Sequence, residues 1–149
     1  MKAVTGVQDV YVYPKRRGLG SVDVAITAVG NPPTLPSQGL LDTAQAALDE
    51  YAGFWADCKV YSPTEQLVPV SAIVAGVGVN LNQVEQVIRD YFAELAPAES
   101  YQASVLVARI IALPNVTDVT LTPSSNIVPT VDWMHTYWLR LGTLSVSAA

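Results

Sequence analysis

Alternating apolar residues on both sides of a short basic turn restrict the first part of this chain to a β-hairpin. The segment Val10–Pro14 alternates valine with tyrosine and ends at a proline. After the turn Lys15–Gly20, apolar and polar residues alternate again over Val22–Thr27. A two-residue period is typical of β-strands, and a short glycine-containing turn brings two such strands together. The sequence therefore predicts that these two strands pair as a hairpin.

A capped amphipathic helix is expected after a stiff connection. Three prolines between Gly30 and Pro36 favour an extended segment, and Ser37 is a suitable N-cap residue. Behind Ser37, apolar residues recur at three- and four-residue spacing as far as Gly53, which ends the helix. An extended segment at Cys58–Tyr61 follows.

The rest of the chain predicts a second set of elements. Leu67–Val79 is long for one strand, and Gly76 or Gly78 is expected to mark a bulge in it. Asn82 and Glu85 resemble a capping box at the start of a helix that Pro97 ends. The last expected elements are a helix at Ser104–Ala112 with Leu106, Val107, Ile110 and Ile111 inward, a strand at Val116–Thr122, and a strand ending at Val146.

The chain has few charges with which to cover these elements. Hydrophobic residues make up 50% of it and charged residues only 14%, against about 25% in a typical globular domain. Both a membrane protein and a subunit covered by neighbours fit this, but no segment offers the roughly 20 apolar residues of a membrane span. The net charge of −5 disfavours nucleic-acid binding. We therefore expect a soluble assembly subunit with no nucleic-acid or membrane partner.

Residues that commonly carry chemistry are sparse. His135 is the only histidine and Cys58 the only cysteine, so no zinc site can be built from them. Gly76 and Gly78 lack the further residues of a phosphate-binding loop. We expect no enzyme, no metal, no cofactor and no small-molecule substrate. The alternative is a small ligand-binding or enzymatic domain with a pocket around His135 and the neighbouring Asp132.

Two groups of side chains are candidate contact residues. Arg16 and Arg17 belong to the only basic cluster, which would either touch an acidic neighbour or simply form a charged, solvated turn. Trp133, Tyr137 and Trp138 are of the types concentrated in interfaces, although core packing explains them equally well. Receptor or glycan binding through this aromatic group is a third possible function.

A nine-residue pattern occurs twice. Gly6–Pro14 and Asn115–Pro123 both place Val-x-Asp-Val after a residue that tolerates positive φ, and both end at a proline. A helix is expected directly before the second copy, whereas only Met1–Thr5 precedes the first. This predicts a fragment or shortened version of a longer protein. Two ordinary helix-to-strand connections would give the same pattern.

A series of short turn and cap motifs runs along nearly the whole chain. They are Val4–Val12, Gly20–Val24, Pro36–Leu41, Cys58–Pro63, Ser104–Leu106, Leu113–Val119 and Leu141–Leu144. In order and spacing they resemble the baseplate J-like proteins of contractile phage tails and related injection machines. Two departures are the absence of the family's N-terminal portion and Asn115 in place of a glycine, a change that the left-handed conformation tolerates.

The elements and the resemblance together predict an α+β fold of two small, consecutive sandwich-like modules with mixed or antiparallel sheets. Residues 1–64 would form a hairpin, a helix and a strand, and residues 65–149 a long strand, two helices and a terminal strand pair. The resemblance implies a structural component of a phage or prophage baseplate wedge, in contact with other wedge proteins and with copies of itself. It also implies a location in the virion tail, and in the host cytoplasm during assembly.

Overall fold

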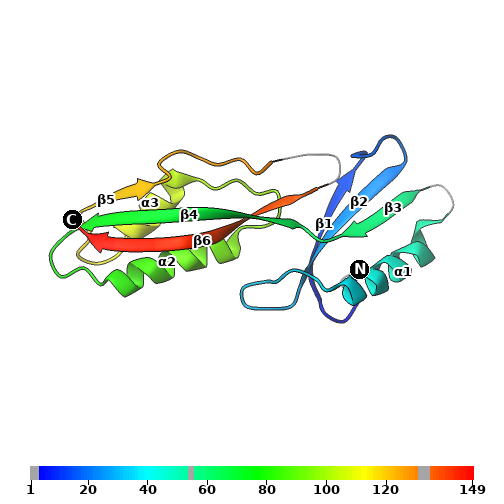
Figure 1. The fold of residues 1–149 in the computed structure, drawn as a ribbon, viewed down its shortest axis with the longest axis horizontal. Helices are drawn as coiled ribbons and strands as arrows, with labels where there is room; N and C mark the ends of the chain where they lie inside the picture. Colours follow the sequence, from blue (N-terminus) through cyan, green and yellow to red (C-terminus); the bar gives the residue numbers. More distant parts are fainter. Residues whose placement is uncertain (1–3, 54–55, 131–134) are drawn as a thin grey trace. The chain divides into compact units, whose positions relative to one another are not determined.

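The alternating segments of the N-terminal part form a hairpin, as predicted (Figure 1). In the computed structural model, which describes residues 4–53, 56–130 and 135–149, β1 (Val7–Pro14) pairs antiparallel with β2 (Ser21–Ala28). On the other side of β2 lies β3 (Asp57–Tyr61), which is parallel to it. Parallel neighbours need a crossover connection, and the predicted helix supplies it.

Helix α1 (Gln38–Ala52) has the caps that the sequence predicts. The Ser37 side chain accepts a hydrogen bond from the Leu40 N–H at 3.3 Å, and Gly53 ends the helix with a positive φ of 63°. One face of α1 packs on the sheet, where Ala44 joins Val24 in a small core. Because this core is small, burial of apolar side chains stabilises the first unit only modestly.

The second sheet is built around the long strand β4 (Thr64–Ala75), with β5 (Asp118–Thr122) antiparallel on one side and β6 (Tyr137–Ala148) on the other. The arrows of β4 and β6 point the same way in Figure 1, so this sheet is also mixed. The two terminal strands therefore lie on either side of β4 and are not neighbours.

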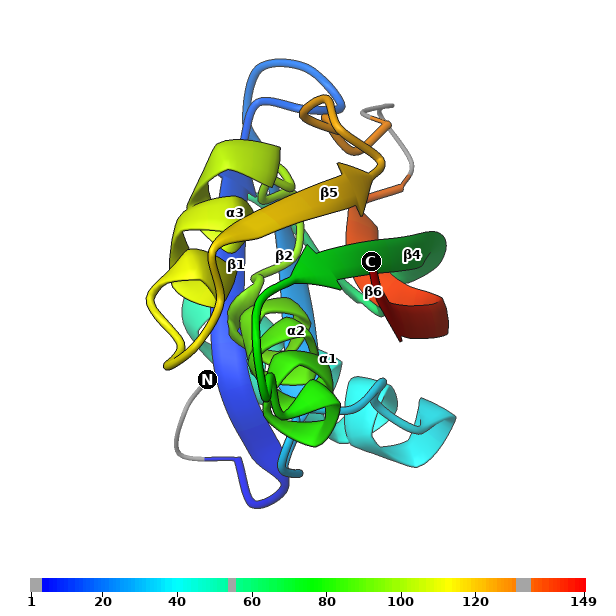
Figure 2. The same ribbon diagram turned by 90° about the vertical axis from the view of Figure 1, so that its left-hand side faces the viewer.

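Helices α2 (Leu81–Glu94) and α3 (Ala103–Ile111) cover one face of the second sheet, as the end-on view in Figure 2 shows. The main core lies between them and β4. Its fully buried members, each less than 2% exposed, are Ala72, Val74, Val84, Ile88, Tyr101, Leu106, Ile110 and Leu139. The rings of Phe92 and Tyr101 stack in this core with their centroids 5.7 Å apart.

Three local expectations for this part are wrong. The N-cap of α2 is Asn80, whose side chain accepts from the Asn82 N–H at 3.1 Å, so the helix begins before the expected capping box. Gly76 follows the end of β4 and does not form a bulge within it. Ile111 was expected inward but is 43% exposed at the last position of α3.

The two copies of the nine-residue pattern occupy matching places. Gly6 and Asn115 both have positive φ, 97° and 68°, as the pattern predicts. Each precedes an edge strand, β1 or β5, that pairs antiparallel with the central strand of its sheet. The repeat therefore marks the antiparallel edge of each sheet.

The described chain divides into two compact α+β units, so the predicted fold class is confirmed. The first consists of Met1–Thr64 and Thr130–Tyr137, and the second of Glu65–Pro129 and Trp138–Ala149. The short segment before β6 thus belongs to the first unit, whereas most of β6 belongs to the second.

Candidate functional site

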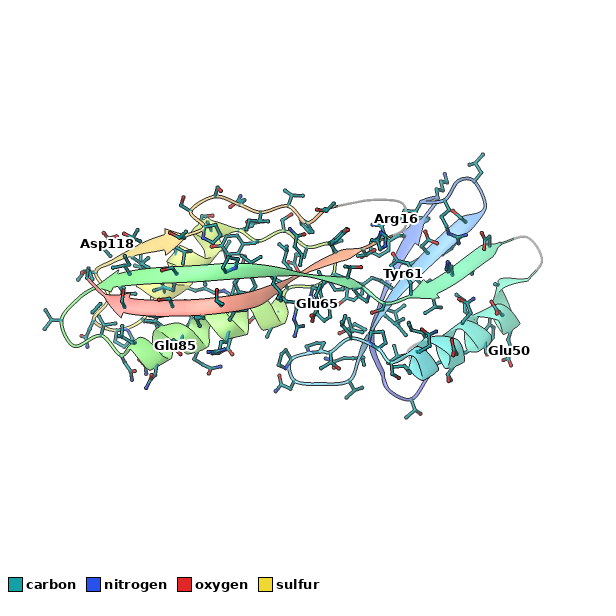
Figure 3. All side chains as sticks on the ribbon, in the orientation of Figure 1. Arg16, Glu50, Tyr61, Glu65, Glu85 and Asp118 are labelled. Atoms are coloured by element: carbon teal, nitrogen blue, oxygen red, sulfur yellow. The ribbon has the colours of Figure 1, made fainter. Side chains whose placement is uncertain are left out.

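Arg16 is the centre of a polar cluster within the first unit. Its Nη1 donates to the Tyr61 hydroxyl at 2.9 Å and also to the hydroxyl of Thr136, which is 1% exposed. Figure 3 shows Arg16 and Tyr61 beside each other. The guanidinium lies over the Tyr13 ring, 4.3 Å from its centroid. Burial and the neighbouring Tyr61 raise the pKa of Tyr13, although Arg16 and Thr136 act in the opposite direction. The cluster joins Thr136 to the first sheet.

Arg17 is held by two carboxylates of the same unit. Its Nε donates to Asp23 Oδ1 at 2.6 Å, and its Nη1 forms an ion pair with Asp57. These two hydrogen bonds, the one to Asp23 above all, raise the pKa of Arg17. The side chain of Asp23 is only 4% exposed, whereas that of Asp57 is 69% exposed. Arg17 therefore stabilises the fold of the first unit.

Replacing Asp23 by alanine is expected to lower the free energy of unfolding by about 1.5–3 kcal/mol, because it removes the buried carboxylate that accepts a charged hydrogen bond from Arg17. Asp57→Ala is the matched control, since it removes the exposed partner of the same arginine and should cost less than about 1 kcal/mol. Urea unfolding followed by circular dichroism measures both. Equal losses for the two variants would contradict the assignment of Asp23 as the dominant partner.

The structure does not gather the three candidate aromatic residues into one exposed patch. Trp138 is 1% exposed and belongs to the core of the second unit, which is the alternative that the sequence left open. Tyr137 is half-buried in the first unit, with its ring centroid 6.0 Å from that of His135. Trp133 lies outside the described residues. Its role in contacts stays a prediction.

The structure describes two of the residues that were proposed for chemistry. His135 is exposed and Cys58 is half-buried in β3. Asp132 lies outside the described residues. Within the described ranges, no group of three or more histidine, cysteine, aspartate or glutamate side chains could hold a metal ion. Of the helices described, none has the length and apolar character to cross a bilayer.

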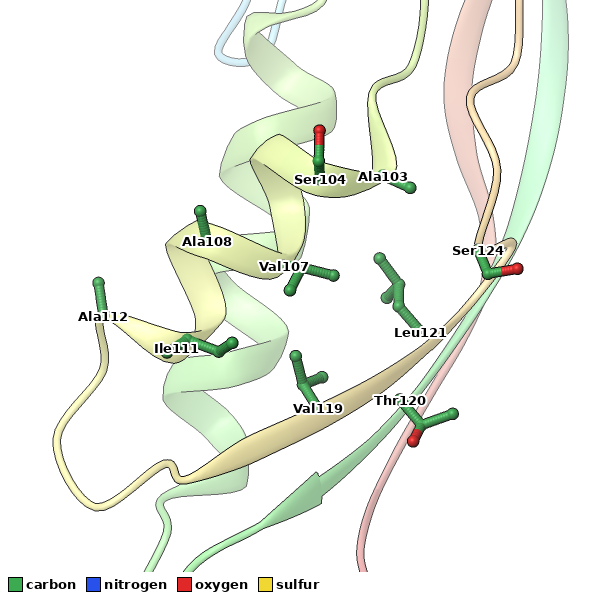
Figure 4. Close-up of a pocket in the computed structure, with 10 residues that line it drawn as sticks. All are labelled: Ala103, Ser104, Val107, Ala108, Ile111, Ala112, Val119, Thr120, Leu121 and Ser124. Carbon is green, nitrogen blue, oxygen red and sulfur yellow. The ribbon is translucent and has the colours of Figure 1, made fainter.

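An open apolar groove of about 870 Å³ lies between α3 and β5 in the second unit (Figure 4). Val107 on the helix faces Leu121 on the strand, while Thr120 points to the opposite face of the sheet. The groove is lined by Ala103, Ser104, Val107, Ala108, Ile111, Ala112, Val119, Thr120, Leu121 and Ser124, none of which is charged. His135 is not among them.

Sequence reasoning missed this groove, although one signal was present. The helix was expected to bury Ile111. However, its apolar residues come in two pairs of sequence neighbours, and a narrow core can cover only one residue of each pair. The groove is concave and apolar but offers no acid, base or nucleophile other than hydroxyl groups, so it is suited to binding an apolar surface and not to catalysis.

Comparison with known families identifies the chain. Residues 1–78 match the family model described as the baseplate J-like central domain, which is more than half of the 149 residues. The chain belongs to the baseplate J-like family. The match covers the first unit's strands and helix and continues to the end of β4. The motifs of residues 104–144 lie outside it, so their part of the resemblance stays a prediction.

Membership of the baseplate J-like family indicates a structural role in a phage tail baseplate. It also indicates a role other than catalysis, together with assembly among phage tail proteins as a component of the virion tail. Among curated proteins, none matches the chain.

Proposed function

We propose that this chain is a subunit of the baseplate wedge and that it works by holding neighbouring wedge proteins and copies of itself in place. The observation that carries the proposal is the family match over residues 1–78. In such a protein the mechanism is geometric, because packed units transmit position, and a change of position, from one subunit to the next.

Two properties of the chain support this reading. Only 14% of its residues are charged, and an uncharged groove lies open on the second unit. Both properties favour binding of a neighbouring subunit, because binding buries apolar surface and removes water from few charged groups. The arginines of the basic turn are paired within the first unit, so the groove is the better candidate for a contact.

We expect this chain in purified contractile tails at a low, constant ratio to the sheath protein. Mass spectrometry of intact particles, with isotope-labelled peptides of both proteins, measures this ratio. Tails whose baseplates have been removed serve as the control and should lack the chain. Its absence from intact particles that carry baseplates would overturn the proposal.

A further inference from the structure

Strand β5 has one edge that pairs with no other strand of the described residues. It is an outer strand of its sheet, whose order is β5-β4-β6. The Val119 N–H does not face β4 but donates to the carboxylate of the adjacent Asp118 at 2.8 Å. Because backbone groups alternate along a strand, the N–H and C=O of Leu121 point the same way as those of Val119. Two residues of β5 can therefore pair with another strand.

We propose that this edge and the α3–β5 groove beside it bind the same surface of a second copy of the chain, with the two β5 strands antiparallel about a two-fold axis at Thr120. This rests on the proposed assembly function and names the surface and the partner. The axis places Val119 opposite Leu121 of the second copy, and such a pair exchanges both of its N–H···O=C bonds. The two sheets then become one.

The charges of β5 favour this self-pairing. Val119–Thr122 carries no charge, and Asp118 would face Thr122 of the second copy. The two Asp118 carboxylates would lie at opposite ends of the paired segment, so like charges do not meet. An axis at Thr120 also brings two threonines together on the open face, a favourable cross-strand pair.

The groove fits the same partner. A two-fold axis that passes through the sheet edge perpendicular to the sheet places both α3 helices on one face, side by side. The groove side of α3 carries the small residues Ser104, Ala108 and Ala112, which allow another helix to come close, together with the partly exposed Ile111. No charged group lines the groove, so its burial against its own copy leaves no charge unpaired.

A single-cysteine cross-link tests the register. In the Cys58→Ala background, Thr120→Cys is expected to form a disulfide-linked dimer on mild oxidation. Its two sulfurs would sit on opposite residues of a non-hydrogen-bonded pair, whose Cα atoms are about 4.5 Å apart and within disulfide range. Thr122→Cys, exposed on the same strand, is the matched control, because the axis would separate the two copies of residue 122 by about 13 Å along the strands.

Sedimentation equilibrium of the full chain tests the groove. Ala108→Glu places a charge in it and should weaken dimerisation at least about tenfold, since one unpaired buried charge costs more than 1.4 kcal/mol. Ala46→Glu, at an exposed position of α1, should leave dimerisation unchanged. Asp118→Ala frees the Val119 N–H and should strengthen it. Circular dichroism confirms that each variant is folded.

The results separate this inference from the proposed function. A monomeric chain that is nevertheless present in tail particles would overturn the self-pairing and leave the baseplate role standing. Equal cross-linking at positions 120 and 122 would overturn the register. Cross-linking of Thr120→Cys to a different tail protein in intact particles would assign the edge to that protein. Dimerisation of a chain that is absent from particles would contradict the baseplate role instead.

Discussion

Replacing Trp138 by alanine is expected to lower the free energy of unfolding by about 4 kcal/mol, as measured by urea unfolding of the full chain. The side chain is 1% exposed, and its loss leaves a large cavity beside the end of α2. Its indole N–H donates to the Leu95 carbonyl at 2.7 Å, where Leu95 is the C-cap residue of α2. The guanidinium of Arg140 lies over the indole ring, 4.3 Å from its centroid.

The Trp138→Phe variant separates packing from hydrogen bonding. It keeps an aromatic ring but removes the N–H, so the buried Leu95 carbonyl loses its donor at a cost of about 1–3 kcal/mol. We therefore expect a free energy of unfolding between those of the wild type and the alanine variant. A loss below about 1 kcal/mol for the alanine variant would mean that Trp138 is not part of the core of the second unit.

Elements whose signals are local were predicted well from the sequence. The hairpin of β1 and β2 and the caps of α1 at Ser37 and Gly53 each depend on a few adjacent residues, and the structure confirms them. The predicted N-cap of α2 was wrong because two asparagines lie close together, and either side chain can accept a hydrogen bond from a backbone N–H. Since the two residues are chemically the same, the sequence could not show which of them caps the helix.

Strand order could not be predicted in the same way. The pairing of β2 with β3 and the central place of β4 depend on contacts between residues far apart in the chain, which periodicity does not encode. The outer position of β5 is a consequence of that order. The partners of Arg16, Tyr61 and Thr136, are likewise distant in sequence. The sequence therefore could not show that Arg16 belongs to a structural cluster and is not simply part of a solvated turn.

The candidate groove illustrates the same limit. The apolar spacing of α3 correctly predicted that Leu106 and Ile110 are buried. It could not indicate that the sheet ends at β5, which leaves Ile111 beside an open groove. A sequence pattern gives the apolar side of a helix, but the width of the sheet beneath it decides how much of that side is covered.

Gly76→Ala is expected to cost about 3–5 kcal/mol of unfolding free energy, combining a backbone clash with left-handed strain. Gly76 lies directly after β4, with a φ of +152°, against the turn before β5. A Cβ there would sit 1.9 Å from the carbonyl oxygen of Asn115 and 2.7 Å from Cγ2 of Val79. Because the closest atom belongs to the backbone, the turn itself would have to move.

Gly78→Ala is the matched control for this prediction. Gly78 also has positive φ, +72°, but a Cβ there would meet only the Asn115 side-chain nitrogen at 3.9 Å. That variant should therefore cost about 1 kcal/mol, the strain of a left-handed non-glycine residue alone. Thermal and urea unfolding of the two variants measure the difference. Similar losses of unfolding free energy for the two variants would mean that backbone conformation alone requires glycine at both positions. The close approach of Asn115 to Gly76 would then not hold the end of β4 against the start of β5.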